Sequence, residues 1–237
     1  MNKTKIEMFS NGFEWNPLRV QCMRDCKNPI GESICWTRRF KKWIPERPVW
    51  DEKELKVPLS RKVPADILVC WMTDLMFMGT NKQIQAIIDV CVTMWALGRP
   101  IRFFFLTKSP ERYQQFKFPE NCWLGTSVAD KNSPLFWQPW RNKIFLSLEP
   151  LYGDVSREVL VSSGNFEACI PDKAYDWVFI GPETRGNAHC ANLKVLPKKK
   201  WLLNIREICK KNNILFWEKN VLGKVGLLDQ LIQQKPF

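Results

Sequence analysis

Short, nearly continuous apolar runs recur along the chain, each bounded by proline, glycine, asparagine or charged residues. Runs of this length that are apolar on both faces are typical of buried parallel strands, because half-exposed strands alternate apolar and polar residues. The pattern predicts six such strands and one more near the N-terminus. Their ranges are 66–72, 101–107, 122–128, 143–148, 176–181 and 213–217, with the additional strand over 13–20.

Helical periodicity occupies intervals between these strands. Over 82–97 apolar residues recur at i, i+3 and i+4, which indicates a helix that buries one stripe. Pro197 is suited to the first turn of a second helix with the same pattern, which should end at Asn212. Shorter helices are expected after Ser109 and after Asn132.

Repeated βα units predict an α/β fold with a parallel sheet and right-handed crossovers. About seven strands favour a partial or full (β/α) barrel of parallel strands over a doubly wound sheet. The chain shows no internal repeat, low-complexity tract or Gly/Ser linker. A single domain spanning residues 1–237 is therefore expected.

The charge balance adds a prediction about partners. The chain has 36 Lys and Arg against 24 Asp and Glu, a formal net charge of +12, and such an excess favours a polyanion such as nucleic acid or a nucleotide. Basic and aromatic residues mix over 38–43 and 198–201, which suits phosphate contact with base stacking. The alternative is a solvated face, with Trp201 directed into the core.

Cysteine usage and the lack of long apolar stretches bear on the compartment. No stretch approaches the roughly 20 apolar residues of a membrane span, and the first residues lack the apolar core of a signal peptide. Nine cysteines is an odd number, scattered among strand and helix patterns. A soluble, cytoplasmic protein with reduced thiols able to bind metal is therefore expected.

Three of the cysteines, Cys22, Cys26 and Cys35, are grouped near the N-terminus with the spacing Cys-x3-Cys-x8-Cys. They follow the first predicted strand, and Pro29 and Gly31 interrupt any helix there. Three nearby thiolates bind zinc or an iron-sulfur cluster. A cubane held by three thiolates leaves one iron open for a substrate or cofactor. Zinc, or three unrelated thiols, remain alternatives.

The other cysteines and the single histidine disfavour several kinds of functional site. Cys70, Cys91, Cys122 and Cys209 lie within strand or helix patterns and read as structural, while Cys169 and Cys190 lie in expected loops. Because His189 is the only histidine, zinc sites built from histidines and Ser-His-Asp catalysis are disfavoured. No phosphate-binding loop or dinucleotide fingerprint occurs.

Polar residues follow successive predicted strands. In a parallel barrel, functional groups gather at the carboxyl ends of the strands, so these side chains are expected at one edge. Each could instead be an ordinary cap or turn residue. The set comprises Thr73, Asp74, Thr107, Lys108, Ser127, Glu149, Glu183, Glu218 and Lys219.

Several short motifs, in order and spacing, resemble the phage-type branch of the radical S-adenosylmethionine (SAM) superfamily, which is distantly similar to spore photoproduct lyase. The resemblance covers nearly the whole chain. It is carried by Trp15-Asn16-Pro17 leading to Cys22, Met72-Thr73-Asp74-Leu75, Leu106-Thr107-Lys108, Trp123-Leu124-Gly125, Ser147-Leu148-Glu149-Pro150-Leu151, Gly181 with Glu183, and Phe216 with Lys219.

The resemblance implies a radical SAM-like barrel holding a [4Fe-4S] cluster on Cys22, Cys26 and Cys35, with SAM on the open iron. Reductive cleavage of SAM would serve to modify or repair a nucleic acid base or nucleotide. A phage-encoded enzyme in a host cytoplasm, supplied by an electron donor such as flavodoxin or ferredoxin, fits this picture. By analogy, the cofactor-binding residues would be Thr73 and Asp74, at the SAM amino group or ribose, with Lys108, Ser127 and Glu149 elsewhere in the pocket.

The sequence also departs from the superfamily. The usual spacing is Cys-x3-Cys-x2-Cys, whereas here Pro29 stands at the third position and the third thiol comes only at Cys35, followed by Trp36. Pro182 replaces an expected glycine after Gly181. A looped-out insertion would return Cys35 to the cluster, with Trp36 or Ile34 packed near the adenine.

Without that return, the chain would be a degenerate relative that binds without catalysis. A non-enzymatic, zinc-stabilised nucleic-acid-binding domain is the alternative from another class. A thiol redox protein is disfavoured, because the chain lacks Cys-x2-Cys.

Overall fold

The computed structural model describes residues 1–9, 11–35, 44–135, 142–160, 175–183 and 195–236. The strands are β1 (Asn2–Lys3), β2 (Gly12–Trp15), β3 (Leu18–Arg19), β4 (Val49–Trp50), β5 (Ala65–Val69), β6 (Ile101–Thr107), β7 (Cys122–Ser127), β8 (Lys143–Leu148), β9 (Trp177–Ile180) and β10 (Leu215–Glu218). The helices are α1 (Glu52–Lys56), α2 (Leu75–Met78), α3 (Asn81–Ala96), α4 (Ser156–Leu160), α5 (Lys199–Lys211) and α6 (Asn220–Lys224), with 3-10 helices η2 (Val57–Ser60) and η3 (Pro110–Gln115).

The fold is mixed α/β with a largely parallel sheet. Eight described strands follow one another in the hydrogen-bonded order β1-β2-β5-β6-β7-β8-β9-β10, and β3 pairs separately with β4. β1 runs antiparallel to β2, whereas β2–β5, β5–β6, β8–β9 and β9–β10 are parallel pairs. Among the described strands the series is open, with β1 and β10 at its ends, so they do not form the closed alternative of the predicted barrel.

The chain divides into two compact units. The first comprises Met1–Arg24, Thr37–Gly125 and Arg141–Lys143, and the second comprises Asp25–Trp36, Thr126–Trp140 and Ile144–Phe237. The single domain expected over residues 1–237 stays a prediction.

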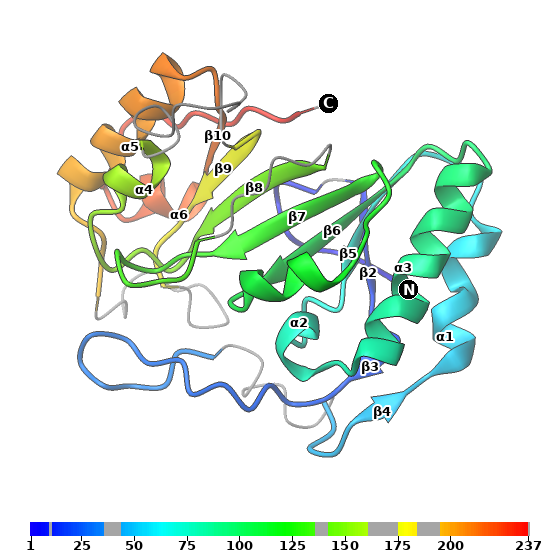
Figure 1. The fold of residues 1–237 in the computed structure, drawn as a ribbon. Helices are drawn as coiled ribbons and strands as arrows, with labels where there is room; N and C mark the ends of the chain where they lie inside the picture. Colours follow the sequence, from blue (N-terminus) through cyan, green and yellow to red (C-terminus); the bar gives the residue numbers. More distant parts are fainter. Residues whose placement is uncertain (10, 36–43, 136–141, 161–174, 184–194, 237) are drawn as a thin grey trace. The chain divides into compact units, whose positions relative to one another are not determined.

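In the first unit, parallel strands carry a core of aromatic and branched residues. Every residue of β5 is buried, and Trp15 of β2 pairs with Val69 of β5, which pairs with Phe105 of β6. Helix α3 begins in a capping box between Thr80 and Gln83, which satisfies amide groups of its first turn. Most of its apolar stripe is buried, but Val92 and Trp95 are exposed. Helix α3 lies beside α1 (Figure 1).

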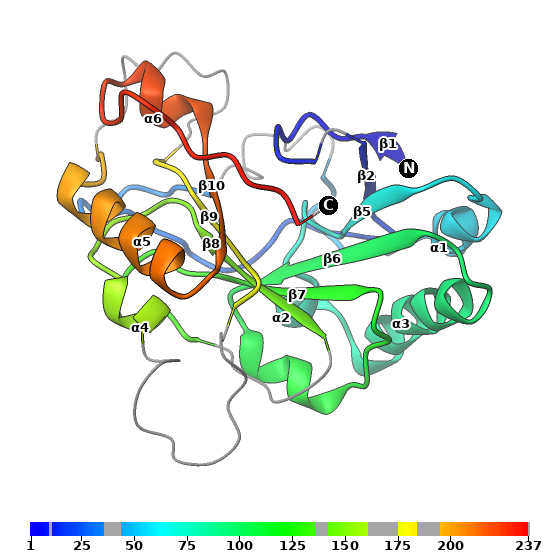
Figure 2. The same cartoon turned by 90° about the horizontal axis from the view of Figure 1, so that it is seen from above.

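In the second unit, β8, β9 and β10 share one core cluster with α5. Helices α4 and α5 lie side by side (Figure 2). Leu202, Ile205 and Cys209 of α5 are fully buried, and Trp201 is partly buried against the same cluster. Trp201 therefore packs toward the core, as the alternative interpretation of the 198–201 run expected.

The six strands predicted from 66–72 to 213–217 are confirmed with small changes at their ends. The expected strand over 13–20 is instead two short strands, β2 and β3, on either side of Asn16 and Pro17. Pro17 has no amide hydrogen for a sheet ladder, which explains the interruption. No helix follows Asn132 over 133–135, and 136–141 lie outside the described residues. Within the described ranges, no helix is both long and apolar enough to cross a membrane.

Candidate metal and cofactor site

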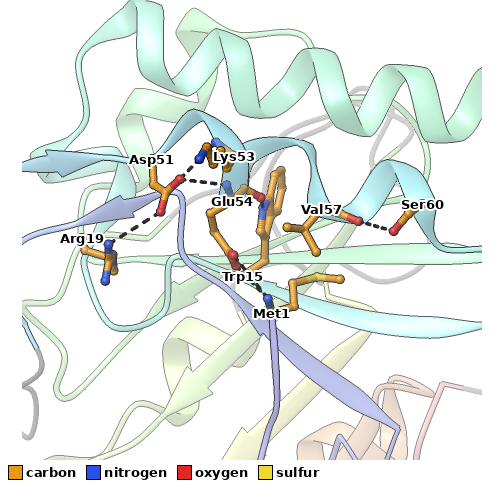
Figure 3. A network of polar contacts seen from close by, with 8 residues as sticks. All are labelled: Met1, Trp15, Arg19, Asp51, Lys53, Glu54, Val57 and Ser60. Atoms are coloured by element: carbon orange, nitrogen blue, oxygen red, sulfur yellow. Dashed lines mark hydrogen bonds and ion pairs between the residues drawn. The ribbon is translucent and has the colours of Figure 1, made fainter.

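The segment that leads to Cys22 is anchored to α1 in the first unit (Figure 3). The indole Nε1 of Trp15 donates to the carbonyl oxygen of Glu54 at 2.8 Å, and the Trp15 side chain is fully buried. The Glu54 carboxylate in turn forms an ion pair with the amino group of Met1 at 3.0 Å. The start of the cysteine segment is therefore fixed by a buried aromatic residue and by backbone hydrogen bonding.

Asp51 gives this segment a second connection to α1 (Figure 3). Its Oδ1 accepts from the amides of Lys53 and Glu54 at 3.0 and 2.9 Å, which caps the helix. Its Oδ2 lies 3.7 Å from Nη2 of Arg19 in β3. The hydrogen bond from the Glu54 amide is the main cause that lowers the pKa of Asp51.

Thr73 holds the next part of the cysteine segment. Its hydroxyl donates to the carbonyl oxygen of Val20 and accepts from the Val20 amide, the second bond at 3.2 Å. Only 2% of Thr73 is exposed. Cys70, at the end of β5, has a φ of +52° and donates its amide to the Trp15 carbonyl at 2.8 Å. Thr73 thus connects the end of β5 to the chain two residues before Cys22, which is itself buried.

The long spacing between Cys26 and Cys35 folds into a closed turn in the second unit. Lys27 and Ser33 form an antiparallel bridge, and the amide of Ile34 donates to the carbonyl oxygen of Cys26 at 3.0 Å. Residues 28–32 therefore loop out, and Cys35 directly follows the residue bonded to Cys26. We call residues 26–35 the cysteine hairpin.

Asn28 organises the turn of the cysteine hairpin. Its Oδ1 accepts from the amides of Ile30 and Glu32 at 3.2 and 2.9 Å. Its own amide donates to the Glu32 carbonyl at 2.9 Å, and its carbonyl accepts from the amide of Gly31 at 2.9 Å. Gly31 has a φ of +79°, which glycine adopts without steric cost. The turn therefore depends on Asn28 and Gly31 rather than on apolar packing.

The hairpin is attached to the end of β9 through Glu183. Its Oε2 accepts from Nδ2 of Asn28 at 3.4 Å and from the hydroxyl of Tyr152 at 2.7 Å. Glu183 is 3% exposed and Asn28 is 5% exposed. This buried carboxylate therefore connects the hairpin to the polar edge formed by the ends of β8 and β9.

The three predicted metal ligands fit a metal site by residue type, but the described part of the chain does not bring them into one group. Three thiols in one short segment suit zinc or an iron-sulfur cluster. Cys26 and Cys35 are partly exposed in the cysteine hairpin, whereas Cys22 belongs to the other unit. Across the described ranges, no three His, Cys, Asp or Glu side chains form a group that could hold a metal ion. The hairpin therefore supplies two thiols from neighbouring backbone positions.

Asp74 is surrounded by donors from the protein. Its Oδ1 accepts from the Thr107 hydroxyl at 2.5 Å and caps α2 through the Phe77 amide at 3.3 Å. Its Oδ2 accepts from the Lys108 amide at 3.0 Å and lies 3.8 Å from Nε of Arg24. Both oxygens are therefore bonded, and Asp74 joins the ends of β5 and β6 to the segment after Cys22.

Replacement of Asp74 by alanine is expected to lower the free energy of unfolding by about 2 kcal/mol, because a helix cap and two strand-end hydrogen bonds are lost together. Urea denaturation measures the change. The matched control is Asp89→Ala, which removes an exposed carboxylate that accepts from Gln85 at 2.8 Å and should change stability by less than about 0.5 kcal/mol. Equal effects of the two variants would contradict a clamping role for Asp74.

Glu149 and Lys219 form an ion pair above Gly181 in the second unit. Glu149 follows β8, Gly181 follows β9 and Lys219 follows β10, so the pair spans three strand ends. A Cβ at Gly181 would lie 3.0 Å from Cδ of Lys219 and 3.2 Å from Cδ of Glu149. Gly181 thus leaves space for the ion pair. Ser127 ends β7 and is 8% exposed.

The remaining described cysteines are structural. Cys70, Cys91, Cys122 and Cys209 are fully buried, and burial raises the pKa of Cys70 and of Cys209 to about 12. Burial, followed by a hydrogen bond with Cys122, raises the pKa of Cys91 well above its ordinary value. Cys169, Cys190 and His189, together with Trp36 and 38–43, lie outside the described residues.

Asn28, Tyr152 and Arg24 were not anticipated from the sequence. The Asn28-Pro29 dipeptide followed by Gly31 is a turn signal, and it could have identified the hairpin. Tyr152 and Arg24 carry no local pattern. Glu218 was expected at the strand-end edge, but its side chain is fully buried and bound to Arg206 of α5.

Residues 15–227 match the model of a family described as a protein of unknown function, DUF5131. Comparisons with the curated proteins and with the solved structures return no match.

Proposed function

The chain belongs to the DUF5131 family. From its own residues we propose that it is a radical SAM enzyme that modifies or repairs a nucleic acid base or nucleotide. The observation that carries the proposal is the cysteine hairpin. The hydrogen bond from Ile34 to Cys26 removes the intervening residues from the path between the two thiols. The long spacing therefore does not separate Cys35 from Cys26 along the backbone of the hairpin.

The proposed architecture is a partial radical SAM-like barrel. It is supported by the parallel pairing of β2, β5 and β6 in one unit and of β8, β9 and β10 in the other. In parallel α/β folds, functional groups occupy the carboxyl ends of strands. Glu149, Gly181 and Lys219 lie at such ends, as do Thr107 and Lys108 in the other unit.

Cys22, Cys26 and Cys35 would hold a [4Fe-4S] cluster whose open iron binds SAM. Such a cluster, reduced by a one-electron donor such as flavodoxin or ferredoxin, supplies the electron for reductive cleavage of SAM. In the protein, Thr73 and Asp74 fix the chain on either side of Cys22.

Lys108, Ser127 and Glu149 are the proposed SAM contacts. Thr73 and Asp74, expected there too, are assigned to positioning because their polar atoms bind neighbouring protein groups. Glu149 is 16% exposed by side chain and its ion pair with Lys219 holds it in place. This leaves part of its carboxylate accessible to a hydroxyl or amino group.

The nucleic acid part of the proposal rests on charge. A net charge of +12 draws phosphates to the chain. Lys198, Lys199 and Lys200 at the start of α5 are exposed, so they can neutralise phosphates. Trp201 packs against the core, so base stacking at this run is not proposed.

Iron, sulfide and zinc analysis of anaerobically purified protein, with electron paramagnetic resonance before and after SAM is added, tests the proposal. We expect about four irons per chain and a spectrum of the reduced cluster that changes with SAM. Zinc alone would favour the zinc-stabilised binding domain, and no metal after reconstitution would favour a degenerate relative. A loaded cluster that cleaves SAM, without DNA or RNA binding at moderate salt, would remove the nucleic acid substrate.

A further inference from the structure

We infer that Asn28 is a positioning residue which, held by the buried Glu183, brings the Cys26 and Cys35 thiols together before any metal binds. The inference deepens the proposed function and rests on it for its biological purpose. Its physical content concerns two thiols and a turn, so it is tested without iron.

Asn28 carries out two tasks that need different atoms. Its Oδ1 accepts from the amides of Ile30 and Glu32, which closes the turn. Its Nδ2 donates to Glu183, which attaches the turn to the end of β9. Only a side chain amide offers an acceptor and a donor at this length. Aspartate would keep the turn bonds but would place a second carboxylate against Glu183.

Burial of Glu183 raises the free-energy cost of losing the hydrogen bond from Asn28. A buried carboxylate that loses a hydrogen-bond donor loses part of its solvation, which costs more than an exposed hydrogen bond is worth. Tyr152 and Asn28 both donate to Oε2 of Glu183, at 2.7 and 3.4 Å. The hairpin is therefore held where it satisfies Glu183.

The closed turn lowers the conformational entropy that is lost when the Cys26 and Cys35 thiols come together. Residues 27 and 33 are paired and Ile34 is bonded to Cys26, so the loop between the thiols is already closed. A site formed in advance loses less conformational freedom when it binds a ligand. Cys26 and Cys35 therefore act as a prepared dithiol within the second unit.

The test is the equilibrium between the Cys26–Cys35 dithiol and its disulfide in the metal-free full chain. Oxidised glutathione is the probe: it takes up the two electrons and two protons that the thiols lose and becomes two reduced glutathione molecules. Alkylation of the remaining thiols and mass spectrometry give the disulfide fraction. We expect Asn28→Ala to lower the equilibrium constant for disulfide formation about tenfold. The matched control is Asn212→Ala, which removes a side-chain hydrogen bond to the Ile208 carbonyl oxygen and should leave that constant within about twofold.

A swap of the two partners separates positioning from general stability. Asn28→Asp should lower the equilibrium constant as much as Asn28→Ala, whereas Asn28→Asp combined with Glu183→Gln should restore it to within about threefold. The double variant returns an amide donor and a carboxylate acceptor in reversed places. If the swap fails to restore the constant while both variants keep the thermal midpoint of the unchanged chain, the inference is overturned.

The remaining outcomes distinguish this inference from the proposed function. A dithiol that depends on Asn28 in a chain that takes up no iron supports the inference and removes the enzyme. A chain that assembles its cluster while Asn28→Ala leaves the disulfide equilibrium and the iron content unchanged overturns the inference alone. No measurable Cys26–Cys35 disulfide in the unchanged chain also overturns it.

Discussion

Replacement of Cys26 by alanine is expected to lower the iron content of reconstituted protein from about four per chain to below about one, because two thiolates do not retain a cubane. Cys22→Ala and Cys35→Ala should do the same. The three cysteines differ in their surroundings: Cys22 is buried after the segment held by Thr73, while Cys26 and Cys35 are partly exposed in the cysteine hairpin. Equal losses from such different positions would indicate one shared metal group.

Cys91→Ala is the matched control for this prediction. Cys91 is fully buried on α3 beside Cys122, so its loss should leave the iron content unchanged and lower the free energy of unfolding by about 1 kcal/mol through a small void. Iron and sulfide analysis with urea denaturation gives both quantities. A full cluster in Cys35→Ala would show that the ligand set is wrong at its third member.

Replacement of Arg206 by alanine is expected to lower the free energy of unfolding by about 3 kcal/mol, since it leaves a buried carboxylate without its counter-ion. The guanidinium of Arg206 donates from Nε and Nη2 to the two oxygens of Glu218, at 3.0 and 2.8 Å. The Glu218 side chain is completely buried. Burial raises the pKa of Glu218, and the Ile232 amide and Arg206 oppose that rise.

The same carboxylate organises the C-terminal segment. The Ile232 amide donates to Oε2 of Glu218 at 2.6 Å, and backbone bonds join Glu218 to Ile232 and Phe216 to Gln234. Arg206→Ala should therefore also speed hydrogen exchange at the amides of Ile232 and Gln234, which report local opening. Urea denaturation and exchange followed by mass spectrometry measure the two effects.

Lys199→Ala provides the control on the same helix. Lys199 forms an ion pair with Asp229 at 3.8 Å, but both side chains are largely exposed, so the change in stability should stay within about 0.5 kcal/mol. Arg206→Ala combined with Glu218→Gln should recover part of the lost stability, because the unpaired charge is removed. If Arg206→Ala behaves like Lys199→Ala, the buried ion pair does not stabilise the fold.

The local pattern of apolar residues was enough to predict the strands and helices that bury a continuous or periodic apolar face. β6 and α3 were predicted from continuous and periodic apolar residues, and both occur within a residue of the predicted range. The short helix expected after Ser109 is confirmed as η3. Helices α1 and α2 were missed, because they depend on single caps, Asp51 and Asp74, rather than on a periodic stripe. A cap signal is short and occurs often by chance, so it predicts little without its partner amides.

The candidate site likewise has features that the sequence predicts and features that only the folded structure decides. The three-cysteine segment and several polar strand ends are readable in the chain, because residue type and the end of an apolar run are local properties. Whether a strand-end residue is exposed or occupied depends on residues far away in sequence: Thr107 and Lys108 bind Asp74, Glu218 binds Arg206, and Glu149 pairs with Lys219.

The long cysteine spacing shows the division most clearly. The order of residues identifies Cys22, Cys26 and Cys35 as candidate ligands, and Pro29 and Gly31 disfavour a helix between the last two. Local bonds close that turn, but its attachment to the end of β9 requires Asn28 to meet Glu183, which is 155 residues away in sequence. Ligand type and local turn preference are therefore encoded along the chain, whereas the attachment of the hairpin to β9 depends on a buried carboxylate that only the folded protein places beside Asn28.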